Sequence, residues 1–200
     1  MKKLISCIFI LAYCVLSCTS TGVLNYQADT ILSTMNDKPQ PDWADESQPF
    51  TIKSGKLYSV GVTEIRGDER PSAGTRIAEN NARANIAKAV ENRMEFIFQN
   101  AEEGLSYDSS AAKYIGSEMS SITSSEMRNE GSWWKRYAQS QEDGTRTIRY
   151  KIYSLITMDE SVFKKAVHDA IRKASGQGKL SPDFQKQVNQ QWDRFVEGDG

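Results

Sequence analysis

The residues best suited to chemistry in this 200-residue chain are few: three cysteines, Cys7, Cys14 and Cys18, and one histidine, His168. A zinc site needs three or four ligands, most often His and Cys, and a Ser-His-Asp or Cys-His arrangement needs a histidine as its base. Every such site would have to use His168, which falls at the edge of the polar side of an expected helix. The sequence therefore predicts no enzyme, no metal site and no cofactor, and the cysteines remain the main candidates for chemistry.

All three cysteines lie in or at the end of an N-terminal targeting segment. Lys2 and Lys3 precede the apolar stretch "LISCIFILAYCVL", which is too short to span a bilayer. Cleavage before Cys18 would remove residues 1–17 as a signal peptide and leave one cysteine, at the first position of the mature chain. An internal disulfide is then excluded, so the folded core must be stable without one.

The residues "VLSC", 15–18, resemble a bacterial lipobox. The resemblance implies that the thiol of Cys18 carries a diacylglycerol, that the preceding peptide is removed and that the new amino group is acylated. Two or three acyl chains anchor a protein stably, at about 0.8 kcal/mol per buried CH2. The alternative is an ordinary signal peptide with an incidental cysteine. Thr19 stands where an Asp would favour the inner membrane, so the resemblance implies the outer membrane and leaves its face open.

A second candidate site is an aromatic and basic segment, made of Trp133, Trp134, Lys135, Arg136 and Tyr137. Successive residues of a strand point to opposite faces of a sheet, so both tryptophans cannot enter the same core. One interpretation is a binding surface for a protein or a glycan, because aromatic residues and Arg are enriched at such contacts. The other, which we favour, is that a C-terminal helix carrying Trp192 and Phe195 covers the strand.

The first half of the chain predicts a tether, a strand and a long helix. Residues 18–41 are polar and predict a lipidated flexible tether, in which residues 26–35 could form a short helix. Residues 56–65 predict a strand, paired with residues 50–52 across a Ser54-Gly55 turn. Gly61 within that strand indicates a bulge or the close approach of another element. The tripeptide "RGD", 66–68, predicts a solvated loop. An apolar stripe then predicts a helix over 75–103, ended by Gly104.

The second half predicts a hairpin between helices. Residues 111–127 predict a weaker helix, and residues 132–140 and 145–158 predict a β-hairpin turned by Asp143-Gly144. One face of the second strand is apolar, and the other is polar at first and apolar later. Asp159 is a candidate N-cap for a helix over 160–175. The resulting prediction is an α+β domain over 42–175, with helices on one face of a small antiparallel sheet, and a C-terminal amphipathic helix within 176–200 that begins at Pro182.

Four segments in this order resemble the LPP-twenty family of small bacterial outer-membrane lipoproteins, which includes a flagellar accessory lipoprotein. They are "PDW" (41–43), "YSVGV" (58–62), "RIAENNARANIAKAV" (76–90) and "TIRYKIYSLITMDESVF" (147–163). The resemblance covers about residues 41–173. It implies a lipid-anchored α+β domain that acts as a scaffold, antigen or structural part of an envelope machine such as the flagellar basal body, and not as an enzyme.

Composition excludes other classes of function. The chain is 38% hydrophobic and 26% charged, which is typical of a globular domain. Without residues 1–17 it holds 23 basic and 26 acidic residues, so we expect no nucleic-acid partner. The expected partners are the membrane, through Cys18, and other envelope proteins or copies of the same chain. The alternative is a periplasmic ligand-binding module that holds peptidoglycan or another glycan on the aromatic and basic strand.

Overall fold

A computed structural model describes residues 28–44, 50–100, 109–141 and 143–197. The elements follow the order β1 (Thr30–Thr34), a short 3-10 helix η1 (Met35–Asp37), β2 (Thr51–Lys53), β3 (Lys56–Arg66), α2 (Pro71–Asn100), α3 (Ser109–Glu126), β4 (Arg128–Ser140), β5 (Arg146–Asp159), α4 (Glu160–Gly176) and α5 (Pro182–Glu197). The strands form one antiparallel sheet in the order β1-β4-β5-β3-β2. The predicted α+β class is confirmed. Gly104, the expected end of the long helix, lies outside the described residues.

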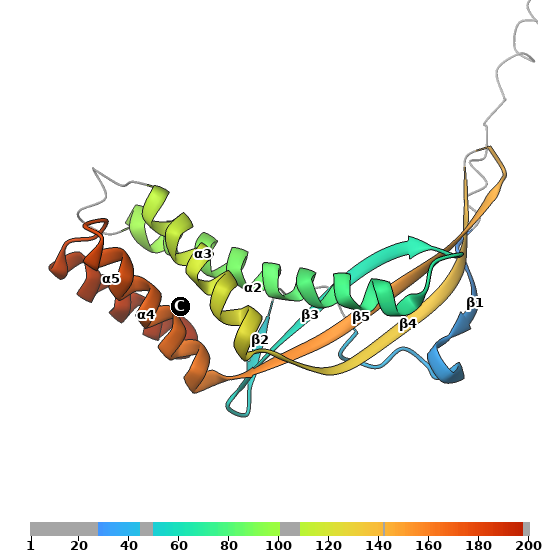
Figure 1. Ribbon diagram of the computed structural model, residues 1–200, viewed down its shortest axis with the longest axis horizontal. Coiled ribbons are helices and arrows are strands. Elements are labelled where there is room, and N and C mark those ends of the chain that lie inside the picture. The colour runs from blue at the N-terminus through green and yellow to red at the C-terminus, as the bar shows by residue number, and fades with distance from the viewer. Residues whose placement is uncertain (1–27, 45–49, 101–108, 142, 198–200) are drawn as a thin grey trace, which may run out of the picture.

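The domain is long and has two different ends (Figure 1). At the helical end, α3, α4 and α5 gather around the second half of α2. We define the sheet end as β1, residues 60–66 of β3, 131–140 of β4 and 146–155 of β5. Among the described residues, the only α-helix that accompanies the strands there is the first half of α2, while the short η1 follows β1 (Figure 1). No helix in the described part of the chain is long and apolar enough to cross a bilayer.

A row of small residues lets α2 lie close on the sheet. Gly61 pairs with Ser154, and Ser154 pairs with Ser132, so the three cross β3, β5 and β4 in register. A Cβ at Gly61 would lie 1.8 Å from the backbone oxygen of Ala78 in α2. The close approach that the sequence indicated at Gly61 is therefore confirmed, and it explains why this strand position carries no side chain. The strand face toward α2 is called the helix face below, and the opposite one the outer face.

The largest buried side chains belong to the helical end. Phe163 of α4 packs edge-on against Trp192 of α5, with ring centroids 5.9 Å apart, and both side chains are fully buried. Gly116 allows α3 to approach α2, because a Cβ there would lie 2.9 Å from the Cβ of Glu91. The predicted C-terminal helix begins at Pro182 as expected. Because Val188 and Trp192 enter this core, the helix packs as part of the domain and is not a separate segment.

The N-terminal segment differs from its prediction. Residues 30–34 form the edge strand β1, paired with β4, where the sequence predicted a tether and a short helix. Since β1 and β2 lie at opposite edges of the sheet, the chain between them must cross it. Residues 35–44, which we call the strap, pack on the outer face: Trp43 and Ala44 pack on Trp133 and Tyr153, and the indole nitrogen of Trp133 donates to the carbonyl of Lys38 at 3.4 Å. The tether prediction is therefore wrong from Thr30 onward, while residues 18–27 lie outside the described residues.

Both predicted turns are confirmed. Ser54 and Gly55 have φ values of 52° and 74°, as a two-residue hairpin loop between β2 and β3 requires. Gly144 has φ 79°, and the carboxylate of Asp143 accepts hydrogen bonds from the backbone nitrogen and the hydroxyl of Thr145 at 2.9 and 2.6 Å. Asp159 does stand at the N-cap of α4, but its side chain makes no capping hydrogen bond.

The free edge of β3 is partly closed by asparagines of α2. The Asn81 amide donates to the carbonyl of Val62 at 2.7 Å, and Asn85 makes a longer contact of 3.5 Å with the carbonyl of Val60. An unpaired strand edge is a template for pairing with another chain. These side chains occupy the acceptors of that edge and so protect it.

Candidate interaction surface

The aromatic and basic segment forms the middle of β4 and divides between the two faces of the sheet. Trp133, Lys135 and Tyr137 pair with Tyr153, Lys151 and Arg149 of β5 and share the outer face with them. Trp134 and Arg136 pair with Ile152 and Tyr150 and lie on the helix face. The alternation that separates the two tryptophans is therefore as predicted, and no single face holds all five residues.

On the outer face the aromatic residues are covered. Trp133 is 5% exposed and packs with Tyr153, ring centroids 5.8 Å apart, beneath Trp43 and Ala44. Tyr137 is buried as well. Burial, together with a hydrogen bond to the carboxylate of Glu64, raises the pKa of Tyr137 far above its usual value. Tyr137 therefore stays protonated at neutral pH and ties β4 to β3.

On the helix face the segment is half-buried. The Trp134 ring stands edge-on to Tyr150 with centroids 5.2 Å apart, and the guanidinium of Arg136 lies over the same ring at 5.7 Å. Ile65, Ala78 and Ile152 form the small buried cluster beside them. Beyond the edge of α2 the helix face is uncovered. Trp134 and Arg136 therefore keep part of their surface exposed on this face, and Lys135 does so on the outer face.

The expected cover of this strand is wrong. Trp192 and Phe195 lie at the helical end, where Trp192 packs on Phe163 and the guanidinium of Arg93 lies over Phe195 at 4.2 Å. The strap covers the outer face in their place. No local pattern indicates this cover, because Trp43 and Trp133 are 90 residues apart and neither belongs to a periodic apolar stripe.

Exposed apolar residues lie next to this segment on both faces of the sheet, and no pattern in the sequence indicates them. Ile31 of β1 is 58% exposed and Leu32 is 48% exposed. Ile31 pairs with Tyr137, and a bulge between Ile31 and Ser33 leaves Leu32 without a partner on β4. Ile148, 40% exposed, lies in the adjacent row, paired with Ala138. Three of the five large apolar side chains that are exposed in the described residues thus lie at the sheet end, the other two being Ile77 and Phe96.

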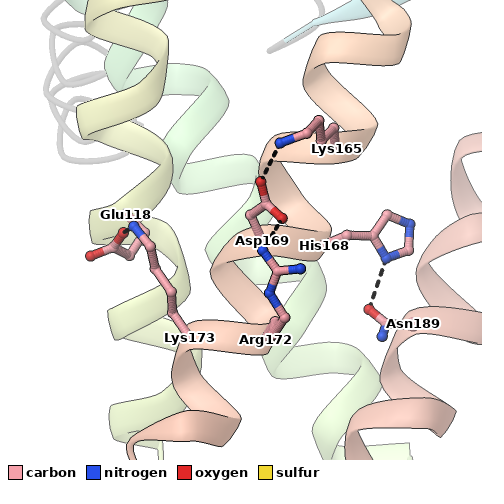
Figure 2. Close-up of polar contacts among 7 residues, drawn as sticks. All are labelled: Glu118, Lys165, His168, Asp169, Arg172, Lys173 and Asn189. Carbon is pink, nitrogen blue, oxygen red and sulfur yellow. Dashed lines mark hydrogen bonds and ion pairs between the residues drawn. The ribbon is translucent and has the colours of Figure 1, made fainter.

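The only histidine of the sequence serves as a contact between helices. His168 of α4 lies 2.9 Å through Nδ1 from the side-chain oxygen of Asn189 and 2.9 Å through Nε2 from Asp193, both in α5. Figure 2 shows the ring pointing from α4 toward Asn189, away from Lys173, which pairs with Glu118 of α3. Both ring nitrogens have partners, so His168, at the edge of the polar side of its helix as expected, links α4 to α5 within the helical end.

One ion pair joins α4 to α3, and two others lie within α4 itself. Lys173 pairs with Glu118 of α3, and Asp169 accepts from Lys165 and Arg172 at 2.7 and 2.8 Å (Figure 2). The hydrogen bond from Lys173 lowers the pKa of Glu118. These groups are partly solvated, so they orient the helices more than they stabilise them.

Cys18, the expected lipid attachment site, lies outside the described residues. The tripeptide "RGD" begins at Arg66, the last residue of β3, and Arg66 and Asp68 pair with each other at 3.0 Å and are both exposed. Within the described ranges, no group of three or more His, Cys, Asp or Glu side chains is arranged to hold a metal ion. No protein-family model, curated protein or solved structure matches the chain.

Proposed function

We propose that the chain is a non-enzymatic lipoprotein, anchored in the outer membrane through Cys18, whose domain is a structural or scaffold component of a cell-envelope assembly. The observation that carries the proposal is the N-terminal sequence: a basic start, a short apolar stretch and "VLSC" precede a domain whose first strand begins at Thr30. A lipid anchor at residue 18 then stands 12 residues before the fold.

The structure of the domain supports a role in assembly. The described residues form one elongated body with a sheet end and a helical end (Figure 1). Each end could contact a different neighbour in an assembly. The single histidine, which any His-dependent chemistry would need, is held between Asn189 and Asp193. The four segments that resemble the LPP-twenty lipoproteins favour the same role, with the flagellar basal body as one such assembly.

The anchor is tested on the protein purified from membranes. We expect mass spectrometry of the mature N-terminus to find a diacylglycerol on Cys18, and Cys18→Ala to move the protein out of the outer-membrane fraction. An unmodified Cys18, or cleavage at another position, would refute the anchor.

The scaffold role is tested by self-association and by capture of envelope partners. Analytical ultracentrifugation of the chain from Thr19 should show concentration-dependent assembly, and a strict monomer at high concentration would count against contacts between copies. The glycan-binding alternative has less support, because Trp133 and Tyr137 are buried. Retention on purified cell wall that Trp134→Ala abolishes would favour that alternative.

A further inference from the structure

We propose that the sheet end is a membrane-contact surface: Ile31 and Leu32 of β1 enter the headgroup region of an anionic bilayer, and the basic residues of the β4–β5 hairpin lie on its surface. This inference rests on the proposed function, which brings the domain near a bilayer, and it goes beyond it by assigning the side of the domain that touches lipid.

The path of the chain places this end nearest to an anchor at Cys18. β1 runs antiparallel to β4, with Thr30 opposite Ala138 and Thr34 opposite Lys135. The chain therefore enters the fold at the hairpin tip, at the end opposite α3, α4 and α5 (Figure 1). The 12 residue steps from Cys18 to Thr30 reach at most about 40 Å when extended, so an anchor at Cys18 keeps the start of β1 within that distance of the bilayer surface.

The side chains at this end fit an interface between lipid and water. Ile31 and Leu32 are about half exposed, and the bulge leaves Leu32 without a β4 partner to pack against. Ile31 lies in the same row as Arg149 on the outer face, across Tyr137, and Thr34 of β1 lies beside Lys135. An apolar patch flanked by basic residues is typical of proteins that lie on a membrane.

The charge of the hairpin favours anionic lipid. Between residues 135 and 151 the chain holds five basic residues, Lys135, Arg136, Arg146, Arg149 and Lys151, against two acidic ones. Arg136 pairs with Ser33 and Lys135 with Thr34, so both stand beside β1. Lys and Arg near an anionic leaflet are attracted to it within a Debye length, which adds to the apolar contact of Ile31 and Leu32.

A second copy of the chain fits this surface less well. Strand pairing at an exposed edge needs a long, regular edge, and natural proteins prevent it with short strands and bulges. β1 has five residues and carries a bulge at its middle. The edge at β1 is therefore poorly suited to strand pairing with a second copy, and its exposed side chains are better suited to contact with a lipid bilayer.

The test uses the chain from Thr19, which keeps every described element and contains no cysteine. An environment-sensitive dye is attached at Leu32→Cys, with Phe96→Cys as the matched control, because Phe96 is also about half exposed but belongs to α2 near the helical end. Vesicles of phosphatidylethanolamine with phosphatidylglycerol should raise and blue-shift the emission of the dye at position 32 only. Equal changes at both positions, or no change at either, would overturn the proposal.

Sedimentation with the same vesicles measures the contribution of each part. We expect Ile31→Glu with Leu32→Glu to weaken binding about tenfold or more, Phe96→Glu to leave it unchanged, and phosphatidylcholine vesicles or high salt to weaken binding about tenfold. If the double substitution instead dissolves a dimer in ultracentrifugation and the parent chain ignores vesicles, the surface contacts a second copy and the proposal is wrong. Because this chain lacks Cys18, the result is independent of whether Cys18 is acylated in the cell.

Discussion

The two ends of this domain are held together in different ways. At the helical end, Phe163, Trp192 and Phe98 are buried with residues of all four helices in one continuous apolar core. At the sheet end, two small clusters stand on opposite faces of the strands, one around Trp133 and Tyr153 and one around Ile65 and Ile152. The first end is stabilised mainly by apolar burial, and the second mainly by strand pairing and by the strap.

The two ends therefore contribute differently: the helical end provides most of the stability, and the sheet end provides exposed apolar surface. Opening a large core has a high cost in free energy, whereas a thin region opens locally without global unfolding. The sheet end is where the chain enters the fold and where Ile31, Leu32 and Ile148 are exposed. We infer that the helical end stabilises the fold and that the sheet end carries the surface that contacts other molecules.

The largest loss of stability is expected at the contact between α2 and the sheet, because both ends depend on it. In Gly61→Ala the new Cβ would lie 1.8 Å from the oxygen of Ala78, and two backbones would have to separate. We expect a loss of at least about 3 kcal/mol in the free energy of unfolding, measured by urea denaturation. Gly131→Ala is the control, because its Cβ would meet Trp43 at an ordinary 3.5 Å. Similar stability of the two variants would mean that α2 does not rest on the sheet as described.

Phe163→Ala measures the helical end alone. Its ring contacts Trp192 and Phe50 with centroids 5.9 and 5.6 Å apart and is fully buried. Removing such a side chain costs about 3–5 kcal/mol, and we expect the whole domain to lose that stability in one cooperative transition followed by circular dichroism. A transition in which the helices melt first and the strands later would show that the two ends fold separately.

Trp133→Ala measures the sheet end. It removes the ring that lies beneath Trp43 and the hydrogen bond to Lys38, so we expect a loss at the lower end of the range for a buried Trp, about 3 kcal/mol, because this cluster is small. Hydrogen exchange should accelerate in β1 and the strap while the amides of α4 and α5 keep their protection. Faster exchange throughout the helices would contradict the separation of the two ends.

The smallest effect is expected at the surface of the helical end. The pKa of Glu118 is lowered by Lys173, so the pair stabilises the fold above the carboxyl's ordinary value of 4.5 and loses that contribution as the pH falls through the lower, folded value. Glu118→Gln should therefore reduce stability slightly at pH 7 and leave it unchanged in strong acid, as followed by thermal melting at several pH values. A loss as large as that of Phe163→Ala would show that α3 depends on this ion pair.

Local patterns predicted most of this fold correctly. The Asp143-Gly144 turn and the alternation of β5 predicted the hairpin, and the apolar stripe of α2 predicted a helix that the structure places at Pro71–Asn100. Each of these signals lies within a few residues or turns of one element. The close approach at Gly61 was predictable for the same reason, since a glycine inside a strand often marks a place where another backbone comes close.

The errors lie where the deciding partner is distant in sequence. "TILST" has no apolar face of its own, and it becomes a strand because β4, more than 90 residues away, offers a free edge. The strap follows from the order of the strands, which no local pattern contains. The sequence indicated the five residues of the aromatic and basic segment. It did not predict which of them are exposed, because their exposure depends on Trp43 and α2, which are distant in sequence.

The antiparallel pairing of β1 with β4 also sets how the domain bears a mechanical load. A force applied to the chain before Thr30 and directed along β1 loads its hydrogen bonds to β4 in shear. All of these bonds bear the force together, because they run perpendicular to the strands. The same pull directed away from the sheet breaks them one after another. A domain held at β1 therefore resists a pull along β1 more strongly than a pull directed away from the sheet.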